Sequence, residues 1–286
     1  MKWNPPQFWQ PDELLRHVES RESSTQVVVV RTSLGDGYVK SMGNPQGEHA
    51  LAREWVGTLL AHWLGLPTFQ FGIINVKEDE LAMLPFLTGN SHARAGPAFI
   101  TKAEPGEVWS GKKRELERLV NRQDLTNLVI LDTWIRNQDR YFPRPALQMP
   151  RIRYNNVFLS HSAPAGQLLL RAMDHSECFT NGRDLVPRHL GIDQAQDSAV
   201  YGLFPEFRGF LNREAAKATA RRLAKIAVLT AEAMVSSIPK QWDVHDSGRK
   251  ALVNFIVDRA VFLSTRIESF LWPQSSLFEE PLETPP

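Results

Sequence analysis

The stretch from Leu131 to Asp174 constrains the fold of this chain more than any other part of the sequence. It contains two apolar runs separated by the turn-forming residues Ala163-Pro164-Ala165-Gly166, a pattern that predicts a pair of antiparallel strands. Asn156 stands at the start of the first run and Asp174 at the end of the second. Because the two outer ends of such a pair lie side by side, these two side chains are expected to meet. The chain that leads into Asn156 is expected to bring Asp139 to the same place.

Asp139, Asn156 and Asp174 are the residue types that phosphoryl transfer from a metal–nucleotide requires. The transition state of that transfer is loose, so a protein assists it mainly by positioning groups and balancing charge. A carboxylate orients the attacking hydroxyl, and oxygen-bearing side chains hold Mg²⁺, a hard cation that takes oxygen ligands. We therefore expect Asp139 to be the catalytic base, with Asn156 and Asp174 as the metal ligands.

The amino-terminal part of the sequence predicts a strand hairpin followed by an anion-binding loop. Val27–Val30 is a run of four β-branched residues, which is typical of a strand buried on both faces. Asp36-Gly37 then favours a tight turn, and Tyr38–Lys40 starts the return strand. The next loop can turn backbone N–H groups toward an anion, and its expected nucleotide-binding residues are Gly43, Asn44, Gln46 and Gly47.

A helix is expected from Glu48 to Leu64, where Gly65-Leu66-Pro67 ends it. If this helix packs on the sheet, Glu54 reaches Lys40 and holds its ammonium group near the phosphates of a nucleotide. A lysine and a glutamate at this spacing are more often ordinary surface charges. The acids farther along the chain are what favour the paired interpretation here.

The rest of the chain alternates short strands and helices. Tyr141–Tyr154 is basic and contains prolines, and we interpret it as an inserted loop whose arginines either steer an acidic or phosphorylated partner or are simply solvated. Ala98–Lys102 is expected to join a strand-rich part to a helical part and to carry an adenine-binding backbone. The other expected elements are helices over 11–20, 113–119, 121–135, 212–238 (capped by Asn212) and 249–271 (capped by Ser247), and strands over 69–76, 81–86, 155–160 and 167–173.

Composition argues against several other functional classes. The net charge of +1 gives no basis for a nucleic-acid or anionic-membrane partner. No apolar run approaches the roughly 20 residues of a membrane helix. A single cysteine, Cys178, rules out an internal disulfide and suits a reducing compartment, so we expect a cytoplasmic protein. Eight histidines without paired spacing give no zinc signature.

Several motifs, taken in order, resemble those of HipA-like kinases, and in particular the shorter, stand-alone branch of that family. The resemblance covers residues 26–272. Its matching segments are Val39-Lys40, Gly43–Gly47, Ala52–Gly57, Leu64–Pro67, Asp132–Arg140, Asp174–Phe179 and Ile238–Trp242. The catalytic pattern is also similar, more distantly, to that of phosphatidylinositol kinases.

The resemblance implies an α+β, two-lobed protein-kinase-like fold, and phosphorylation of Ser or Thr on a protein substrate with ATP and Mg²⁺. It places Lys40 at the phosphates, oriented by Glu54, with Asp139 as the base and Asn156 and Asp174 at the metal. The implied organisation is a lead over 1–24, a nucleotide-binding lobe over 25–101, a catalytic helical lobe over 102–274 and a disordered tail over 275–286. The residues do not identify the protein substrate, and the family also suggests an antitoxin or regulatory partner.

The sequence departs from the family pattern at three positions. Tyr141 replaces the histidine after Asp-Arg, and Ser176 replaces the glycine after Asp-His. Asn156 follows Asp139 by 17 positions where the family has five, so the inserted residues must leave and return at one place. The metal-and-base residues are all retained, which favours an active kinase. The alternatives are a nucleotide-binding pseudokinase, which would hold a partner through the Tyr141–Tyr154 loop, and a small-molecule or lipid kinase.

Overall fold

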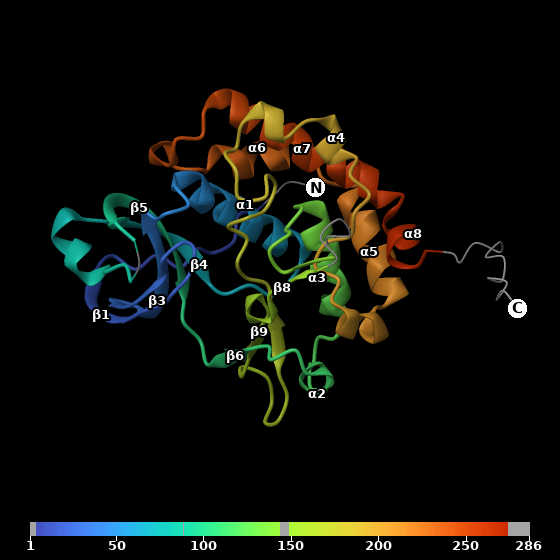
Figure 1. Cartoon of the computed structure of the whole chain (residues 1–286), viewed down its shortest axis with the longest axis horizontal. Helices are drawn as coiled ribbons and strands as arrows, with labels where there is room; N and C mark the ends of the chain where they lie inside the picture. The colour runs from blue at the N-terminus through green and yellow to red at the C-terminus, as the bar shows by residue number, and fades with distance from the viewer. Residues whose placement is uncertain (1–3, 88, 144–148, 274–286) are drawn as a thin grey trace, which may run out of the picture.

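The computed structural model describes residues 4–87, 89–143 and 149–273 of the chain. An antiparallel sheet forms its amino-terminal part, and helices form most of its carboxy-terminal part (Figure 1). The strands of the sheet, in the spatial order β1-β2-β3-β5-β4, are β1 (Leu14–Ser20), β2 (Val28–Thr32), β3 (Gly35–Met42), β4 (Phe71–Val76) and β5 (Arg94–Lys102). This architecture confirms the expected α+β fold class. The tail expected over 275–286 lies outside the described residues.

The hairpin of β2 and β3 turns earlier than the sequence indicated. The chain reverses at Ser33-Leu34, so Asp36-Gly37 lies inside β3 and the predicted Asp-Gly turn is wrong. Gly37 has a different role, because a Cβ atom at this position would lie 2.9 Å from the ring of Trp9. A glycine inside a strand often marks such a close approach.

A strand, β1, replaces the helix expected over Pro11–Ser20, so that prediction is wrong. β1 pairs antiparallel with β2 at the edge of the sheet. Leu14 is buried there, while Leu15 and Val18 are exposed. Pairing with β2 outweighs the local helical pattern, since propensity is only a weak prior. Residues 21–27 thereby become the loop that connects two neighbouring strands of the sheet.

The strand expected over Leu81–Phe86 is absent, because residues 81–83 belong to a 3₁₀ helix, η1 (Glu78–Met83), and residues 84–86 are in neither a strand nor a helix; that prediction is also wrong. The buried carboxylate of Glu80 explains the difference. It accepts from the backbone N–H groups of Leu14 and Lys77, both at 2.8 Å. These bonds cap the helix and fasten it to β1.

Helix α1 (Glu48–Leu64) has the expected bounds and is buried on nearly all sides. It packs against β3 and β5 on one side and against the helical part on the other (Figure 1). The guanidinium of Arg53 donates to the backbone O of Ser176 at 2.5 Å. A Cβ atom at Gly57 would lie 2.5 Å from the Cβ of His175. α1 is therefore in direct contact with the chain that follows Asp174.

The carboxy-terminal part contains helices of very different lengths. They are α2 (Lys113–Leu116), α3 (Gln123–Trp134), α4 (Ile192–Ala195), α5 (Arg213–Leu223), α6 (Val228–Ser236), α7 (Asp246–Ser264) and α8 (Ile267–Leu271). Among the described residues, no helix combines the length and the apolar character that a membrane crossing requires.

Both long helices expected near the carboxy terminus are divided in two, so their predicted continuity is wrong. Ala227 has an extended backbone, with φ −87° and ψ 147°, which separates α5 from α6. A second break, at Arg266, separates α7 from α8. Asn212 caps α5 as expected, since its side chain accepts from Ala215 N at 2.8 Å. Ser247 is not a cap, because it lies inside α7.

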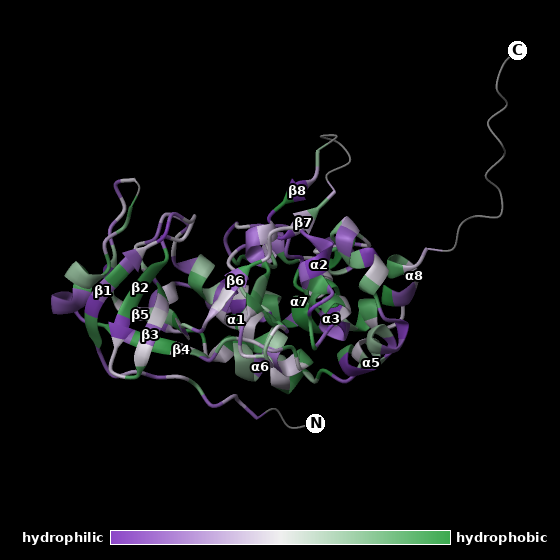
Figure 2. Ribbon diagram, turned by 90° about the horizontal axis from the view of Figure 1, so that it is seen from below, coloured by the Kyte–Doolittle hydropathy of each residue, from purple (hydrophilic) through white to green (hydrophobic). Residues whose placement is uncertain are grey.

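Short strands complete the helical part. β6 (Gly106–Val108), β9 (Phe158–Ser160) and β10 (Leu169–Arg171) form a small sheet in the order β10-β9-β6. β9 and β10 pair antiparallel as the sequence predicted, with Phe158 opposite Arg171. Both are shorter than expected, and Asn155 and Asn156 belong to a 3₁₀ helix, η3 (Tyr154–Asn156), that precedes β9. Within the Tyr141–Tyr154 insertion, β7 (Tyr141–Phe142) and β8 (Arg151–Ile152) form a separate hairpin that projects from the helical part (Figure 2).

Gly57→Ala tests the close packing of α1 against His175. Alanine is the better helix former by about 1 kcal/mol, so helix propensity alone would stabilise the variant. Overpacking in a tight core costs about 1–3 kcal/mol, and we expect this cost to outweigh the gain. Urea unfolding should therefore give a lower free energy of unfolding for Gly57→Ala. Gly209→Ala is the matched control, because a Cβ atom there meets nothing within 4 Å. A Gly57→Ala variant as stable as wild type would contradict this packing.

Candidate active site

A cavity of about 350 Å³ is lined by residues of both the sheet and the helical part. An apolar cavity with a few convergent polar groups is the usual form of a small-molecule site. The apolar lining consists of Val27, Tyr38, Phe69, Phe99, Val108, Phe158, Ala172 and Met173. The polar lining includes Lys40, Glu54, Thr58, Thr101, Asn155, Asn156 and Asp174.

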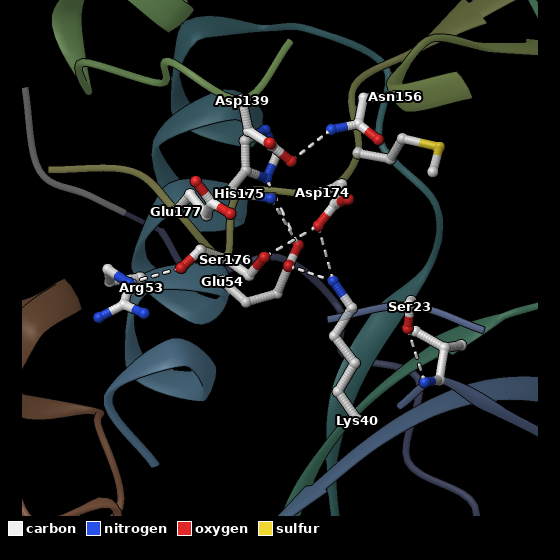
Figure 3. Close-up of polar contacts among 12 residues, drawn as sticks. Ser23, Lys40, Arg53, Glu54, Asp139, Asn156, Asp174, His175, Ser176 and Glu177 are labelled. Atoms are coloured by element: carbon white, nitrogen blue, oxygen red, sulfur yellow. Dashed lines mark hydrogen bonds and ion pairs between the residues drawn. The ribbon is translucent and has the colours of Figure 1, made fainter. Parts of the chain in front are cut away.

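The ammonium group of Lys40 is the centre of a polar network (Figure 3). Its Nζ donates to Glu54 Oε2 at 2.5 Å and to Asp174 Oδ1 at 2.9 Å. Lys40 comes from β3, Glu54 from α1 and Asp174 from the segment after β10, so one cation connects three elements. The side chain of Lys40 is 12% exposed and that of Glu54 only 3%. The sequence-predicted pair of Lys40 and Glu54 therefore meets in the structure.

The two charges of this pair change each other's pKa. Burial acts to lower the pKa of Lys40, but the carboxylates of Asp174 and Glu54 raise it above its ordinary value. Burial acts to raise the pKa of Glu54, but the charge of Lys40 and the contact with His175 lower it well below its ordinary value. Both groups are therefore held in their charged forms.

Asp174 has a left-handed backbone conformation, with a φ of 57°. Aspartate enters this region more readily than most residues. The segment is fixed on both sides, since the backbone N–H of His175 donates to Glu54 Oε1 at 3.1 Å and Ser176 Oγ donates to Asp174 Oδ1 at 3.1 Å. Ser176, where the resemblance led us to expect glycine, thus helps to orient the carboxylate of Asp174.

Asp139 follows α3 and is almost fully buried. Its Oδ2 accepts from Asn156 Nδ2 at 2.8 Å, and its backbone N–H donates to Asn137 Oδ1 at 3.2 Å. Because the amide nitrogen of Asn156 faces Asp139, its amide oxygen lies on the other side (Figure 3). Asp139 is thus in contact with Asn156, which lines the same cavity as Asp174.

Arg140 connects the segments that carry these residues. It is fully buried, and it donates to Asp132 Oδ2 at 2.7 Å, to the backbone O of Met173 at 3.0 Å and to the backbone O of Asn156. The end of the insertion lies next to Arg140, since the backbone N–H of Arg153 donates to Arg140 O at 2.9 Å. The inserted residues therefore leave and re-enter the fold at one place, and Asn156 keeps its position next to Asp139.

Two arginines of the insertion contact Asp139, and the sequence did not indicate this. Arg151 and Arg153 form ion pairs with Asp139 Oδ1, the latter at 3.0 Å, and Arg151 also pairs with Glu177 at 3.0 Å. Burial and the carboxylates of Asp174 and Glu177 raise the pKa of Asp139, while the two arginines act to lower it. The only available signal was the basic character of the insertion, because the β7–β8 register decides which carboxylate the arginines meet.

The cavity also contains residues that sequence reasoning missed. Arg21, Glu22 and Ser23, from the connection between β1 and β2, line it. They were missed because β1 was expected to be a helix outside the sheet. If residues 14–20 had been recognised as a strand, residues 21–27 would have been expected to connect it to β2.

The loop of Gly43, Asn44, Gln46 and Gly47 is not among the residues that line the cavity. Its polar groups have other partners: Asn44 Oδ1 accepts from Gln46 N at 3.0 Å, and Gln46 Nε2 donates to Glu177 at 3.5 Å. A nucleotide-binding role of this loop stays a prediction.

The oxygen donors of the site suit Mg²⁺. Asp174 offers a carboxylate oxygen and Asn156 an amide oxygen, and Mg²⁺ commonly uses one or two carboxylates together with phosphate oxygens and water. Within residues 4–87, 89–143 and 149–273, no three His, Cys, Asp or Glu side chains gather as a metal-binding group. A metal at this place would therefore depend on the oxygens of a bound nucleotide to complete its coordination.

The buried pair of Lys40 and Glu54 is expected to be energetically coupled. Lys40→Met leaves the carboxylate of Glu54 without this cation and should cost about 3 kcal/mol of stability. Lys40→Met/Glu54→Gln removes both charges, so its loss should fall short of the sum of the single losses by about 1–3 kcal/mol. Urea unfolding of the four proteins measures this difference. Strictly additive losses would show that the two side chains act independently.

Comparisons with known proteins give a family and a fold for the chain. No curated protein matches the chain. Among solved structures, the Helicobacter pylori proinflammatory kinase CtkA matches with a TM-score of 0.58, over 93% of this chain and 98% of its own, at 10% sequence identity. This likeness shows the fold and confirms that it is kinase-like. The model of the HipA-like kinase family matches residues 13–272, which is most of the sequence. The chain therefore belongs to the HipA-like kinase family.

Proposed function

We propose that this protein transfers the γ-phosphoryl group of ATP, with Mg²⁺, to a Ser or Thr hydroxyl of a protein substrate. Family membership supports a kinase, the arrangement of the site supports transfer from Mg²⁺–ATP, and the choice of a Ser or Thr acceptor rests on the resemblance of the motifs. The observation that carries it is the position of Lys40 between Glu54 and Asp174, in the cavity that Asn156 lines beside Asp139. These side chains supply the cation, the metal ligands and the base that such a transfer uses.

Asp139 is assigned to the acceptor hydroxyl. The hydroxyl oxygen attacks the γ-phosphorus, the bond to the β–γ bridging oxygen breaks, and the hydroxyl proton passes to the carboxylate of Asp139. Lys40 neutralises phosphate oxygens, and Glu54 fixes the direction of its ammonium group. Asn156 and Asp174 would hold Mg²⁺, which would neutralise charge on the phosphates.

The remaining cavity is suited to the rest of ATP. Aromatic side chains such as Phe69 and Phe158, whose ring centroids lie 4.9 Å apart, offer an apolar surface to an adenine ring. Ser23 lies on the same side of the site as the Lys40 side chain (Figure 3). We assign the connection between β1 and β2, which carries Ser23, to the phosphates of the nucleotide.

Asp139→Asn is expected to separate the chemistry from nucleotide binding. Asparagine keeps the shape of the side chain but cannot take the proton, so transfer should fall by about 10²–10⁴-fold. ATP affinity should change little in this variant. Asp174→Asn should instead weaken the Mg²⁺-dependent part of ATP binding, and chelation of Mg²⁺ should do the same in wild type. Transfer is measured with labelled ATP on a protein extract, and binding by calorimetry.

Other outcomes would redirect the assignment. A wild-type protein that binds Mg²⁺–ATP but labels no protein would be a nucleotide-binding pseudokinase. If mass analysis finds the transferred phosphate on a lipid or a small molecule, the protein is a kinase of a different class. Phosphoamino-acid analysis tests the choice of Ser or Thr. Undiminished transfer by Asp139→Asn would exclude this residue as the base.

The protein substrate, an antitoxin or regulatory partner and a cytoplasmic location stay predictions. A phosphoproteome comparison of cells that produce the wild type with cells that produce Asp139→Asn would identify the substrate directly, because fold alone does not fix it.

A further inference from the structure

Both oxygens of the Asp139 carboxylate are engaged in this structure. Oδ2 accepts from Asn156 Nδ2 at 2.8 Å, and Oδ1 is in ion-pair contact with Arg151 and Arg153. Oδ1 has no hydrogen-bond partner among the described residues, so the contacts of the arginines are electrostatic rather than aligned hydrogen bonds. The two guanidinium groups share this one oxygen. While they stay, they occupy the oxygen that an acceptor hydroxyl would use.

The hairpin that carries these arginines is fixed at its base. Phe142 of β7 stacks on Tyr201, with ring centroids 5.0 Å apart and an interplanar angle of 12°. The backbone O of Tyr141 accepts from Gly202 N at 2.9 Å. The base of β7 therefore belongs to the packed part of the molecule, and β8 pairs with it in a defined register. The packed base of the hairpin and its strand pairing therefore hold Arg151 and Arg153 near Asp139.

The arginines beside Asp139 can exchange its carboxylate for another anion. Arg151 also contacts Glu177, with Nη1–Oε2 at 3.0 Å and Nη2–Oε1 at 3.1 Å, so it keeps a carboxylate partner if Asp139 turns away. The side chain of Arg153 is 48% exposed, so an anion from solution can reach it. A substrate with basic residues beside its hydroxyl would be repelled by the two arginines. A substrate with neutral residues there would have to separate the arginines from Asp139 without offering them another anion.

We propose that Arg151 and Arg153 bind an anionic group, a carboxylate or a phosphate, that lies beside the acceptor hydroxyl of the protein substrate, and release Asp139 as they bind it. This proposal rests on the proposed kinase function. Guanidinium groups pair well with both anions, often through two parallel hydrogen bonds. Once Asp139 is released, its carboxylate is available to the hydroxyl. Acceptors without a neighbouring anion react slowly, because Asp139 stays paired with the arginines.

Matched peptide mixtures test the proposal. Peptides with a central Ser are prepared with Glu, phosphoserine, Gln or Lys on both sides of it, and with random residues farther away. Wild type should phosphorylate the Glu or the phosphoserine mixture about tenfold or more faster than the Gln mixture, since hydrogen bonds to charged groups are the stronger ones. The Lys mixture should be the slowest. The rates with Glu and with phosphoserine distinguish a carboxylate from a phosphate.

Arg153→Gln should change the peptide preference in two opposite ways. It should raise KM for the anionic mixtures and raise kcat for the Gln mixture, because one of the groups that block Asp139 is gone. Arg153→Lys should keep part of the preference. Arg153 is half-exposed, so these variants should fold even if Arg151→Gln, which removes the ion pair of Glu177, does not. Arg221→Gln removes an exposed arginine of α5 and controls for net charge.

A binding measurement without nucleotide separates recognition from catalysis. A fluorescent peptide of the preferred mixture should bind wild type several-fold more tightly than Arg153→Gln, and added salt should weaken the binding. ATP hydrolysis is followed in the same set of reactions. If wild type neither binds nor hydrolyses ATP, the proposed kinase function fails.

Two results would overturn the role of the arginines while the kinase function stands. One is ATP turnover by wild type without preference for anionic peptides, including the case in which no peptide is labelled. The other is an equal loss of activity on all mixtures in Arg153→Gln, because that pattern reports general damage rather than recognition.

Discussion

The contact of the Lys40 ammonium with the carboxylates of Glu54 and Asp174 is the interaction on which the rest of the site depends. It crosses from the sheet to α1 and to the segment after β10, so the cavity has its shape only while all three are assembled. Burial makes the carboxylate of Glu54 costly without the cation. The buried charges of Lys40 and Glu54 therefore stabilise each other, and such mutually perturbed charged groups are concentrated at functional sites.

Much of this assembly was predictable from the sequence, because it follows from local patterns. The apolar runs around the Ala163–Gly166 turn predicted β9 and β10, and their pairing placed Asn156 and Asp174 on one cavity. The Gly-Leu-Pro stop after Leu64 predicted the end of α1, and α1 then brought Glu54 to Lys40. In each case a local turn or stop signal defines the element that carries the side chain to the cavity.

The errors have a common physical cause, which is that long-range partners outweighed local signals. β1 owes its extended form to pairing with β2, and η1 owes its form to the buried carboxylate of Glu80. Asp36-Gly37 is typical of a turn, but the packing of Trp9 explains the glycine. The contact of Arg151 and Arg153 with Asp139 depends on the β7–β8 register, which no single-sequence pattern records.

Helix α1 has a further consequence. Its Arg53 is wholly buried and donates to the backbone O of Ser176 at 2.5 Å and to that of Arg183 at 2.6 Å. These hydrogen bonds attach the helix to the segments beyond Asp174, in addition to its packing on the sheet. In protein kinases the position of the corresponding helix controls the Lys–Glu pair and hence activity. A rotation of α1 away from these segments would leave the buried guanidinium of Arg53 without its two backbone acceptors. The position of α1, and with it the Lys40–Glu54 contact, is therefore fixed by the segments beyond Asp174 as well as by the sheet.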